Sequence, residues 1–448
     1  MSALDHARRV LVHAPRTLGA LALLTVPLPV TLAVTAAALV RSLLVTPVRA
    51  EAEDPRTVLV SGGKMTKALA LARAFHAAGH RVVLVESARY RLTGHRFSRA
   101  VDAFHVVPEP GAPGYVEALR DVVVAEGVDV WVPVCSPAAS RYDALAKPVL
   151  AEFCEVLHPD PQVLGILDDK DRFAEAADTL GLPVPETHRV VAAKQVEDFD
   201  FDAQPGPWIL KSVPYDPVAR LDLTTLPRPT AAETEEFARS KPMSADTPWI
   251  LQEFTPGREY CTHSTVRDGR VQVWACCESS AFQLNYAMVD KPAIQEWVRR
   301  FVGALRVTGQ VSFDFIETPD GRLVALECNP RTHSAITMFH RDEVALARAY
   351  LHDLGPGEPP LTPRPDSRPT HWLYHELWRM VSRPSTIPER LGVIRRGTDA
   401  VFDRDDPLPF LLLHHLQIPS LLLRNLVAGR PWIRVDVNIG KLVEPAGD

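Results

Sequence analysis

The stretch from Gln310 to Ser334 constrains the fold of this chain more than any other part of its sequence. Apolar and polar residues alternate on both sides of a Pro-Asp-Gly turn, which predicts two half-buried strands joined as a hairpin. Proline presets φ for such a turn, and glycine accepts a positive φ at its end. Because side chains two apart on a strand share a face, Glu327 and Asn329 point in the same direction.

The register of this hairpin decides whether Asp314 joins them. If the turn holds four residues, Asp314 lies opposite Ala325 and faces the same side as Glu327. A turn with an odd number of residues needs a β-bulge to give the same result. In both cases we expect two carboxylates and an amide oxygen to converge.

Converging carboxylates are costly unless a cation lies between them. Mg²⁺ bridging nucleotide phosphates suits the oxygen atoms of Asp314, Glu327 and Asn329, and Mn²⁺ could replace it. Arg331, just beyond, could hold a phosphate or a carboxylate in the fork of its guanidinium. The competing interpretation is an ordinary hairpin whose acids face solvent.

An earlier segment predicts a βαβ unit and therefore a parallel sheet, with strands at 57–60 and 81–86 around a helix at 65–78. A later apolar run, 128–135, predicts another buried strand. Ligands of open α/β sheets bind at the carboxyl ends of the strands. The candidates for substrate contact are therefore Ser61, Lys64, Ser136 and Glu86. A helix-capping loop explains this stretch equally well.

Two lysines stand at the ends of predicted elements. Lys170 opens a helix behind two aspartates that suit the helix dipole, and Lys211 ends the apolar strand 208–211. From two different elements they could reach the phosphates of one nucleotide. Taken singly, each is explained as a surface lysine.

A further apolar strand, 248–254, breaks at Thr255-Pro256-Gly257. An adenine ring needs an apolar wall and free backbone amides at such a strand end, where Glu253 and Phe254 lie. Glu259, just beyond, is placed to accept the ribose hydroxyls. The alternative is a β-bulge followed by a polar strand.

Composition excludes some classes of function. The chain is 46% apolar and 23% charged, as in globular proteins, and its net charge of −6 with no basic patch argues against nucleic acid as a partner. The six cysteines show no metal-ligand spacing, and Cys276 and Cys277 are too close in sequence for an ordinary disulfide between them. They are typical of reduced cysteines in the cytosol.

The N-terminal stretch 17–40 carries no charge and is long enough to cross a membrane, with arginines on both sides of it. A secretory signal, a single span and a re-entrant or interfacial hairpin broken at Pro27 and Pro29 all fit. Export would separate a protein with the nucleotide-binding candidates described above from its nucleotide. We therefore expect attachment to the cytoplasmic face of a membrane; the alternative is a helix packed on the protein body.

The C-terminal region follows a proline-rich linker at 355–369. An amphipathic pattern begins at Trp372, and 408–426 is strongly apolar but interrupted at Pro419. This region could cover the active site, pack on the N-terminal stretch or lie on a membrane.

The order of these motifs resembles the ATP-grasp superfamily from about residue 57 to residue 350: a βαβ domain, Asp-Lys, strand-Lys, Glu-Phe-x-x-Gly-x-Glu, and a hairpin with Asp, Glu and Asn-Pro-Arg. The resemblance implies that Lys170 and Lys211 contact the phosphates of ATP. Glu253 and Phe254 would line the adenine slot and Glu259 would bind the ribose. It also implies that Asp314, Glu327 and Asn329 hold Mg²⁺.

One departure concerns the loop that covers the phosphates, which is usually rich in glycine in that superfamily. The corresponding stretch here, 212–220, has no glycine. It should be stiffer, and Tyr215 or Arg220 could do the covering.

Several strings resemble one branch of the superfamily, the mycosporine-glycine synthase family of mycosporine-like amino acid biosynthesis. They are Ser-Gly-Gly-Lys-Met-Thr-Lys-Ala-Leu from Ser61, Gly-His-Arg-Phe-Ser from Gly94, Val-Pro-Val-Cys-Ser-Pro from Val132, Cys-Thr-His-Ser-Thr-Val-Arg-Asp-Gly from Cys261, Glu-Cys-Asn-Pro-Arg-Thr-His-Ser from Glu327 and Asn-Ile-Gly-Lys from Asn438.

That family couples glycine to the cyclohexenone 4-deoxygadusol with ATP. The resemblance implies an ADP-forming ligase. Its chemistry needs cations near the transferring phosphoryl group and the departing phosphate, for which we expect Arg331 and Lys211 as catalytic residues. From their positions alone, His333, Ser334, His263 and Lys64 could bind the substrates, and structural histidines with internal hydrogen bonds explain the two histidines equally well. Two rivals stay open: another carboxylate–amine ligase that forms an acyl phosphate, and a non-catalytic, ATP-binding membrane protein.

The expected fold is α/β, an ATP-grasp fold with a Rossmann-like domain before it. We expect an apolar segment and linker at 1–54, the α/β domain at 55–160, the ATP-grasp domain at 161–354, a linker at 355–370 and a mostly helical extension at 371–448. The expected ligands are ATP, Mg²⁺, a cyclohexenone and an amino acid.

Overall fold

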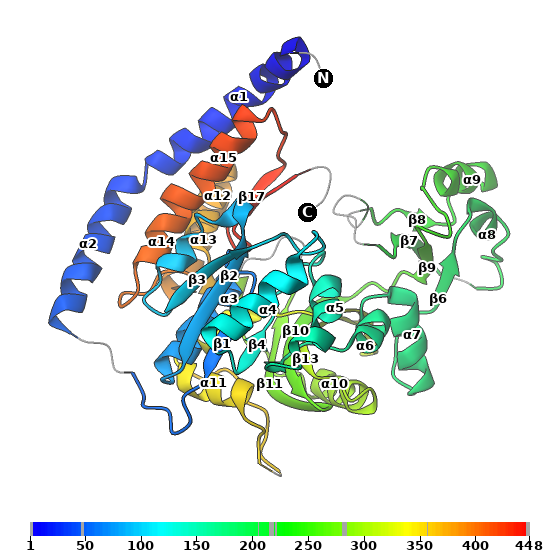
Figure 1. Cartoon of the computed structure of the whole chain (residues 1–448). Coiled ribbons are helices and arrows are strands. Elements are labelled where there is room, and N and C mark those ends of the chain that lie inside the picture. The colour runs from blue at the N-terminus through cyan, green and yellow to red at the C-terminus, as the bar shows by residue number, and fades with distance from the viewer. Residues whose placement is uncertain are drawn as a thin grey trace.

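The computed structural model describes residues 3–45, 49–204, 206–214, 219, 222–279, 285–355 and 357–444, with the side chains of 3–9 and 43 left aside. The chain forms a central parallel sheet and an antiparallel sheet side by side. A small lobe projects from one end and a layer of helices covers the other (Figure 1).

The parallel sheet is built from the predicted βαβ unit and has the order β3-β2-β1-β4-β5. Val58 and Val60 of β1 pack on one side and Leu59 on the other, so the strand is apolar on both faces, as buried parallel strands are. The predicted strand at 128–135 is shorter, because regular pairing ends at Val132. The parallel sheet and its helices are β1 (Thr57–Val60), α3 (Thr66–Ala77), β2 (Arg81–Ser87), β3 (Ala103–Val107), α4 (Tyr115–Glu126), β4 (Val130–Val132), α5 (Ser140–Leu150) and β5 (Glu155–Val156).

The loop between β1 and α3 needs glycine at position 62. Gly62 has φ of +69°, and a Cβ there would lie 2.0 Å from the carbonyl oxygen of Val134. The loop therefore lies directly against the chain that leaves β4. This close approach shapes the carboxyl edge of the parallel sheet.

We expect Gly62→Ala to destabilise the protein by about 1–3 kcal/mol more than Gly114→Ala, since an inserted methyl group must displace backbone. Gly114 is the matched control, because its φ is also positive, +82°, but nothing lies within 4 Å of its added Cβ. Thermal or urea unfolding of both variants measures the difference. Equal destabilisation would mean that the loop is not packed as the structure has it.

The small lobe holds an antiparallel sheet of order β6-β9-β7-β8, with two helices on it. The second antiparallel sheet has the order β11-β10-β13-β14 and contains the predicted hairpin. The lobe consists of β6 (Thr187–Val190), α8 (Ala193–Glu197), β7 (Trp208–Ser212), β8 (Thr225–Leu226), α9 (Ala231–Arg239) and β9 (Trp249–Glu253). Between the parallel sheet and the lobe lie α6 (Pro161–Leu167) and α7 (Lys170–Thr179). The second sheet and its helices are β10 (Arg258–Arg267), β11 (Arg270–Glu278), α10 (Pro292–Ala304), β13 (Gly309–Glu317), β14 (Leu323–Asn329) and α11 (Glu343–Leu351).

The turn of the β13–β14 hairpin holds an odd number of residues, so the second of the two predicted arrangements, with a bulge, is the one that forms. Glu317 pairs with Leu323, which leaves Thr318 to Arg322 in the turn. A bulge then shifts the register between Asp314 and Phe315, and Asp314 pairs directly with Glu327. The bulge restores the common face that the functional prediction needs.

The apolar face of this sheet carries an aromatic core. Phe313 and Phe315 are fully buried against Trp297 and Phe301 of α10 and Phe173 of α7. Because successive side chains of a strand point to opposite faces, the same packing turns the acidic side chains to the other face of the sheet. The core thus fixes the direction of the candidate ligands.

The C-terminal region is mostly helical, as expected. Its small strands β15 (Thr370–His371) and β16 (Thr398–Asp399) pair with each other, and β15 also pairs with β12 (Asn285–Tyr286) of the preceding domain. Its helices are α12 (Leu373–Ser382), α13 (Ile387–Arg396), α14 (Leu408–Leu412) and α15 (Ile418–Val427). A π-helical turn, Leu413–Gln417, joins the last two helices, and the hairpin of β17 (Arg434–Asp436) and β18 (Lys441–Val443) ends it. The proline-rich linker is not detached, because Leu361 exchanges backbone hydrogen bonds with the edge strand β11.

The N-terminal stretch forms two helices, α1 (Ala3–Thr25) and α2 (Leu28–Leu44), with the break at the predicted prolines. They lie along α14 and α15 in Figure 1. The Trp432 indole donates to the Thr17 hydroxyl at 3.0 Å, Thr31 bonds Tyr374 at 3.0 Å and Arg41 pairs with Asp405. The N-terminal stretch therefore packs on the C-terminal extension.

Candidate active site

The acidic cluster forms where β13 and β14 pair. The amide nitrogen of Asn329 donates to Asp314 at 3.1 Å and to Glu327 at 3.4 Å, so all three predicted ligands meet. A half-turn of the Asn329 amide would present its oxygen instead of its nitrogen to a cation. The predicted metal ligands are thus gathered on one face.

The charges of this cluster call for a cation. Burial raises the pKa of Asp314 well above its usual value, and the facing charge of Glu327 adds to the rise. Burial would also raise the pKa of Glu327, but Lys170, Lys211 and Arg331 outweigh it and lower that pKa to about 2. Two facing carboxylates, of which Asp314 is disfavoured as an anion, fit Mg²⁺, which prefers carboxylate and amide oxygens.

The two predicted phosphate lysines reach this cluster from different elements. Lys170, the first residue of α7, lies 3.3 Å from Glu327, and Asp169 caps the helix through the amides of Asp171 and Arg172. Lys211 on β7 donates to Gln252 of β9 at 2.9 Å, and burial lowers its pKa. Lys211 therefore faces the acids from the lobe, and Lys170 faces them from α7.

Arg331 follows the hairpin and is held by it. Its guanidinium donates to the side-chain oxygen of Asn329, and its backbone amide donates to the Asn329 carbonyl at 2.7 Å. The carbonyls on either side of it are tied to the first domain: Pro330 accepts from Ser140 at 3.0 Å, and Thr332 accepts from Lys67 at 2.6 Å. The arginine thus lies at the junction of the two sheets.

The predicted adenine slot differs from expectation in its hydrogen bonds. The amides of Glu253 and Phe254 are not free, because they donate to the carbonyls of Glu186 and Pro207 at 2.9 and 2.8 Å. In the part of the chain that the structure describes, the buried hydroxyl of Thr255 has no hydrogen-bond partner. The Thr255 hydroxyl is therefore available to a ligand at this strand end, and sequence reasoning did not single it out. Glu259 is exposed on β10, where a ribose could reach it.

The predicted covering residues Tyr215 and Arg220 lie outside the described residues.

A cavity of about 350 Å³ opens at the carboxyl ends of β1, β2 and β4. This volume is at the lower end of the range, roughly 300–1,000 Å³, that small-molecule sites occupy. Lys64 lines it as predicted, with its ammonium 3.6 Å from Glu86 and over the ring of Tyr90 at 4.3 Å. Ser61, Ser136 and Glu86 also line it.

Lys67 has Lys64 of the cavity wall and Arg331 among its charged neighbours. Sequence reasoning did not single out this lysine. Burial, followed by repulsion from Arg331, lowers its pKa to about 7. A lysine one turn after Lys64 in a helix-opening motif was a signal that could have been used.

Two of the predicted substrate residues, His263 and Ser334, have other contacts. His263 is fully buried, and its ring accepts from the His333 amide at 3.2 Å and meets the Tyr350 hydroxyl at 3.3 Å. Ser334 bonds Asn438 at 3.0 Å. The structure thus gives His263 and Ser334 internal hydrogen bonds, which leaves direct substrate contact without support.

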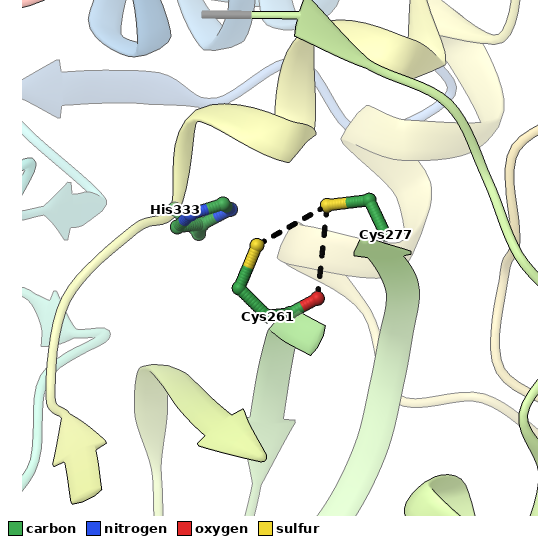
Figure 2. Close-up of side chains that lie close together, drawn as sticks. All are labelled: Cys261, Cys277 and His333. Carbon is green, nitrogen blue, oxygen red and sulfur yellow. Dashed lines mark hydrogen bonds between the residues drawn. The ribbon is translucent and has the colours of Figure 1, made fainter. Parts of the chain in front are cut away.

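His333 belongs to a group with two thiols, seen in Figure 2. The sulfurs of Cys261 and Cys277, direct partners across β10 and β11, are 3.4 Å apart, and the ligand atoms of all three residues lie within 4.8 Å of one another. Such a set could hold a soft cation such as Zn²⁺. The ring of His333 also packs edge-on against Tyr286. These contacts do not place His333 on a substrate.

Comparisons with known proteins identify the fold. No protein-family model matches the sequence, and no curated protein sequence does. Among solved structures, N5-carboxyaminoimidazole ribonucleotide synthetase, as its ADP complex, aligns with a TM-score of 0.54 and 14% identity over 76% of this chain and 88% of its own. L-amino acid ligase from Bacillus licheniformis gives 0.54 and 15% over 71% and 80%. Biotin carboxylase from Campylobacter jejuni, in a nucleotide complex, gives 0.54 and 14% over 67% and 72%.

The chain thus has the ATP-grasp fold with a parallel-sheet domain before it, as the motif order predicted.

Proposed function

We propose that this protein is an ATP-dependent, ADP-forming ligase that joins glycine to 4-deoxygadusol and so forms mycosporine-glycine. The observation that carries the proposal is the convergence of two lysines, two carboxylates, an amide and an arginine at the β13–β14 hairpin. Three of the solved structures with this fold are named as complexes with ADP or its magnesium salt, which supports ATP as the nucleotide here. The choice of acceptor rests on the family resemblance of the sequence.

The metal would lie on Asp314, Glu327 and Asn329 and would neutralise the transferring phosphoryl group. Lys170 and Lys211 would bind the phosphate oxygens from two sides. An enol oxygen of the acceptor would attack the γ-phosphorus, and ADP would leave. This step converts a poor leaving group into phosphate.

In the second step the glycine amine would add to the carbon that bears the phosphate. The amine would lose a proton, the C–O bond would break and phosphate would leave, which gives an enaminone. Arg331 lies where the departing phosphate needs a cation. The buried ammonium of Lys67 donates to the carbonyl of Thr332, the residue after Arg331, and it would help to hold this negative charge.

The test uses the full chain, since the N-terminal helices pack on the C-terminal extension. Purified protein is incubated with ATP, Mg²⁺, 4-deoxygadusol and glycine. The ultraviolet band of the enaminone should appear with equimolar ADP. Release of ADP without product, or no turnover while ATP still binds, would refute the acceptor.

A second candidate is a carboxylate–amine ligase that acts through an acyl phosphate. The similarity to the fold of L-amino acid ligase favours it, because the same cluster would serve a carboxylate acceptor. Screening carboxylic acids and amines for ADP release separates the two. A non-catalytic ATP-binding membrane protein would release no ADP with any acceptor.

We also propose that the protein lies on the cytoplasmic face of a membrane through α1 and α2. The pair bends by 41°, as a broken span or a re-entrant loop would, and the segment Leu408–Val427 also has the length and apolarity of a span, although 44% of it is buried. Away from the body the pair exposes apolar side chains, including Leu11 at 73%, Val30 at 67% and Val40 at 58%. An apolar face of this kind would lie in a lipid interface.

We expect Val30→Glu with Val40→Glu to weaken binding to phospholipid vesicles by roughly a hundredfold, because two charges would enter the interface. Vesicle flotation measures it. Val124→Glu is the control, since Val124 is exposed on α4 at 59% but far along the chain from the pair. Equal flotation of the double variant and the wild type would exclude this surface.

A further inference from the structure

The C-terminal hairpin β17–β18 reaches the cavity in the first domain. Its connecting segment carries Asn438, whose carbonyl accepts from the amide of Thr66 at the start of α3 at 2.9 Å. The Asn438 side chain bonds the Ser334 hydroxyl beyond β14 at 2.8 Å. The segment therefore joins the loop before α3 to the loop that follows the metal hairpin.

Gly440 shows how closely this segment is packed. Its φ is +60°, and a Cβ there would lie 2.2 Å from the carbonyl oxygen of Lys64. The Gln417 side chain donates to the Gly440 carbonyl at 2.8 Å from the other side. The backbone of the hairpin is thus in contact with the loop that carries the predicted substrate lysine.

The next residue, Lys441, lies on the wall of the same cavity as Lys64 and Arg89. Burial, together with repulsion from Lys64, lowers the pKa of Lys441 to about 8. Arg89 is paired with Glu444 of the same C-terminal segment. Two of the three cations on this wall are therefore placed or held by the C-terminal extension.

The other polar groups of the wall suit a hydroxylated ligand. Among the described residues the buried hydroxyl of Ser87 has no hydrogen-bond partner, and it lines the cavity. Glu109 also lines the cavity, and its carboxylate could accept a hydrogen bond from a hydroxyl of the ligand. Glu86 is already engaged by the amides of Lys64 and Ser87 at 3.0 and 2.8 Å. Cations beside hydroxyl-binding groups define a site for a small anion that also carries hydroxyls.

We propose that Lys441, together with Lys64, binds the negatively charged oxygen of the acceptor, an ionised cyclic enol, so that the C-terminal hairpin determines acceptor specificity. The inference rests on the proposed function and names the site of its acceptor. The enol of a cyclic 1,3-diketone is a vinylogous acid and is ionised at neutral pH. Its charge needs a buried cation, and a neutral ketone would not.

The position of the cavity agrees with the proposed reaction. Lys67, whose charge interacts with both Lys64 and Arg331, lies between the cavity and the phosphate cluster. An acceptor on Lys64 and Lys441 would therefore lie on the first-domain side of Arg331, with the nucleotide on the other. Lys441 is a specificity residue here, and the lysines at the phosphates remain the catalytic ones.

The test compares Lys441→Met with the wild type in the full chain. We expect the KM for 4-deoxygadusol to rise by roughly ten- to a hundredfold, as for a lost hydrogen bond to a charge, while the KM for ATP stays the same. Lys441→Arg should restore most of the affinity. Lys194→Met is the control, because Lys194 is exposed on α8. An unchanged acceptor KM in Lys441→Met, or an equal rise for ATP, would overturn the inference.

A binding measurement separates this inference from the proposed function. Cyclohexane-1,3-dione, a simple ionised enol, is titrated into both proteins by calorimetry at neutral pH without ATP. Binding to the wild type that Lys441→Met loses supports the site, even if no ligase activity is found. No binding to the wild type, or equal binding to both proteins, refutes the site, even if mycosporine-glycine forms.

Discussion

Asp314→Asn is expected to lower kcat by roughly 10²–10³-fold, the loss seen when one preorganised charge-stabilising group is removed from an active site. Asp314 faces Glu327 directly and accepts from Asn329 at 3.1 Å, so it is central to the predicted cation site. Asparagine keeps the shape of the side chain and removes one negative charge. Steady-state kinetics at several Mg²⁺ concentrations should show that a higher concentration of the metal is needed for half-maximal activity.

The same variant should keep or raise the stability of the metal-free protein. Burial and Glu327 raise the pKa of Asp314, which means that the ionised form is disfavoured in the fold. A neutral amide removes this repulsion. A lower melting temperature together with full activity would contradict the metal assignment.

Asp320→Asn provides the matched control. Asp320 lies in the turn of the same hairpin, where its carboxylate is 64% exposed beside Arg322. Removal of its charge should leave kcat within about twofold, because exposed pairs contribute little. An equal loss in both variants would mean that the hairpin, and not the cation site, is sensitive to substitution.

Lys211→Met should have the second large effect, a loss of kcat of roughly 10²-fold or more. Lys211 lies near the end of β7 and is one of two lysines whose charges lower the pKa of Glu327. Methionine keeps the length of the side chain without the ammonium. The affinity for ADP, measured by calorimetry, should fall with kcat.

Two controls show whether the charge or its placement matters. Gln252→Leu removes the group to which Lys211 donates at 2.9 Å, and we expect about a tenfold loss of kcat, since the lysine remains but is less well held. Lys241→Met changes another lysine of the lobe, one that pairs with Asp222, and should leave kcat unchanged. Full activity in Lys211→Met would exclude a role at the phosphates.

The hairpin shows what local patterning predicts well. Alternation placed Phe313 and Phe315 on one face and the acids on the other, and the structure agrees. The sequence left open whether the turn holds four residues or an odd number with a bulge, and only the structure shows five residues and a bulge after Asp314. Register depends on hydrogen bonds between strands, which side-chain pattern describes only in part.

Other predictions failed where contacts come from distant parts of the chain. The amides of Glu253 and Phe254 are bonded to Glu186 and Pro207, and His263 is enclosed by Tyr350. A histidine in a strand has the same sequence pattern whether its face is open or covered. Only the packing of neighbouring elements distinguishes the two cases.

By itself the sequence determined the order of elements, the apolar faces and the ends of strands at which Lys170, Lys211 and Asp314 stand, because these follow from local periodicity and spacing. The tertiary structure alone decided that Lys441 meets Lys64 at one cavity and that α1 packs on α15. These pairs are hundreds of residues apart along the chain, and their contact depends on how whole layers pack together. No local pattern encodes that packing.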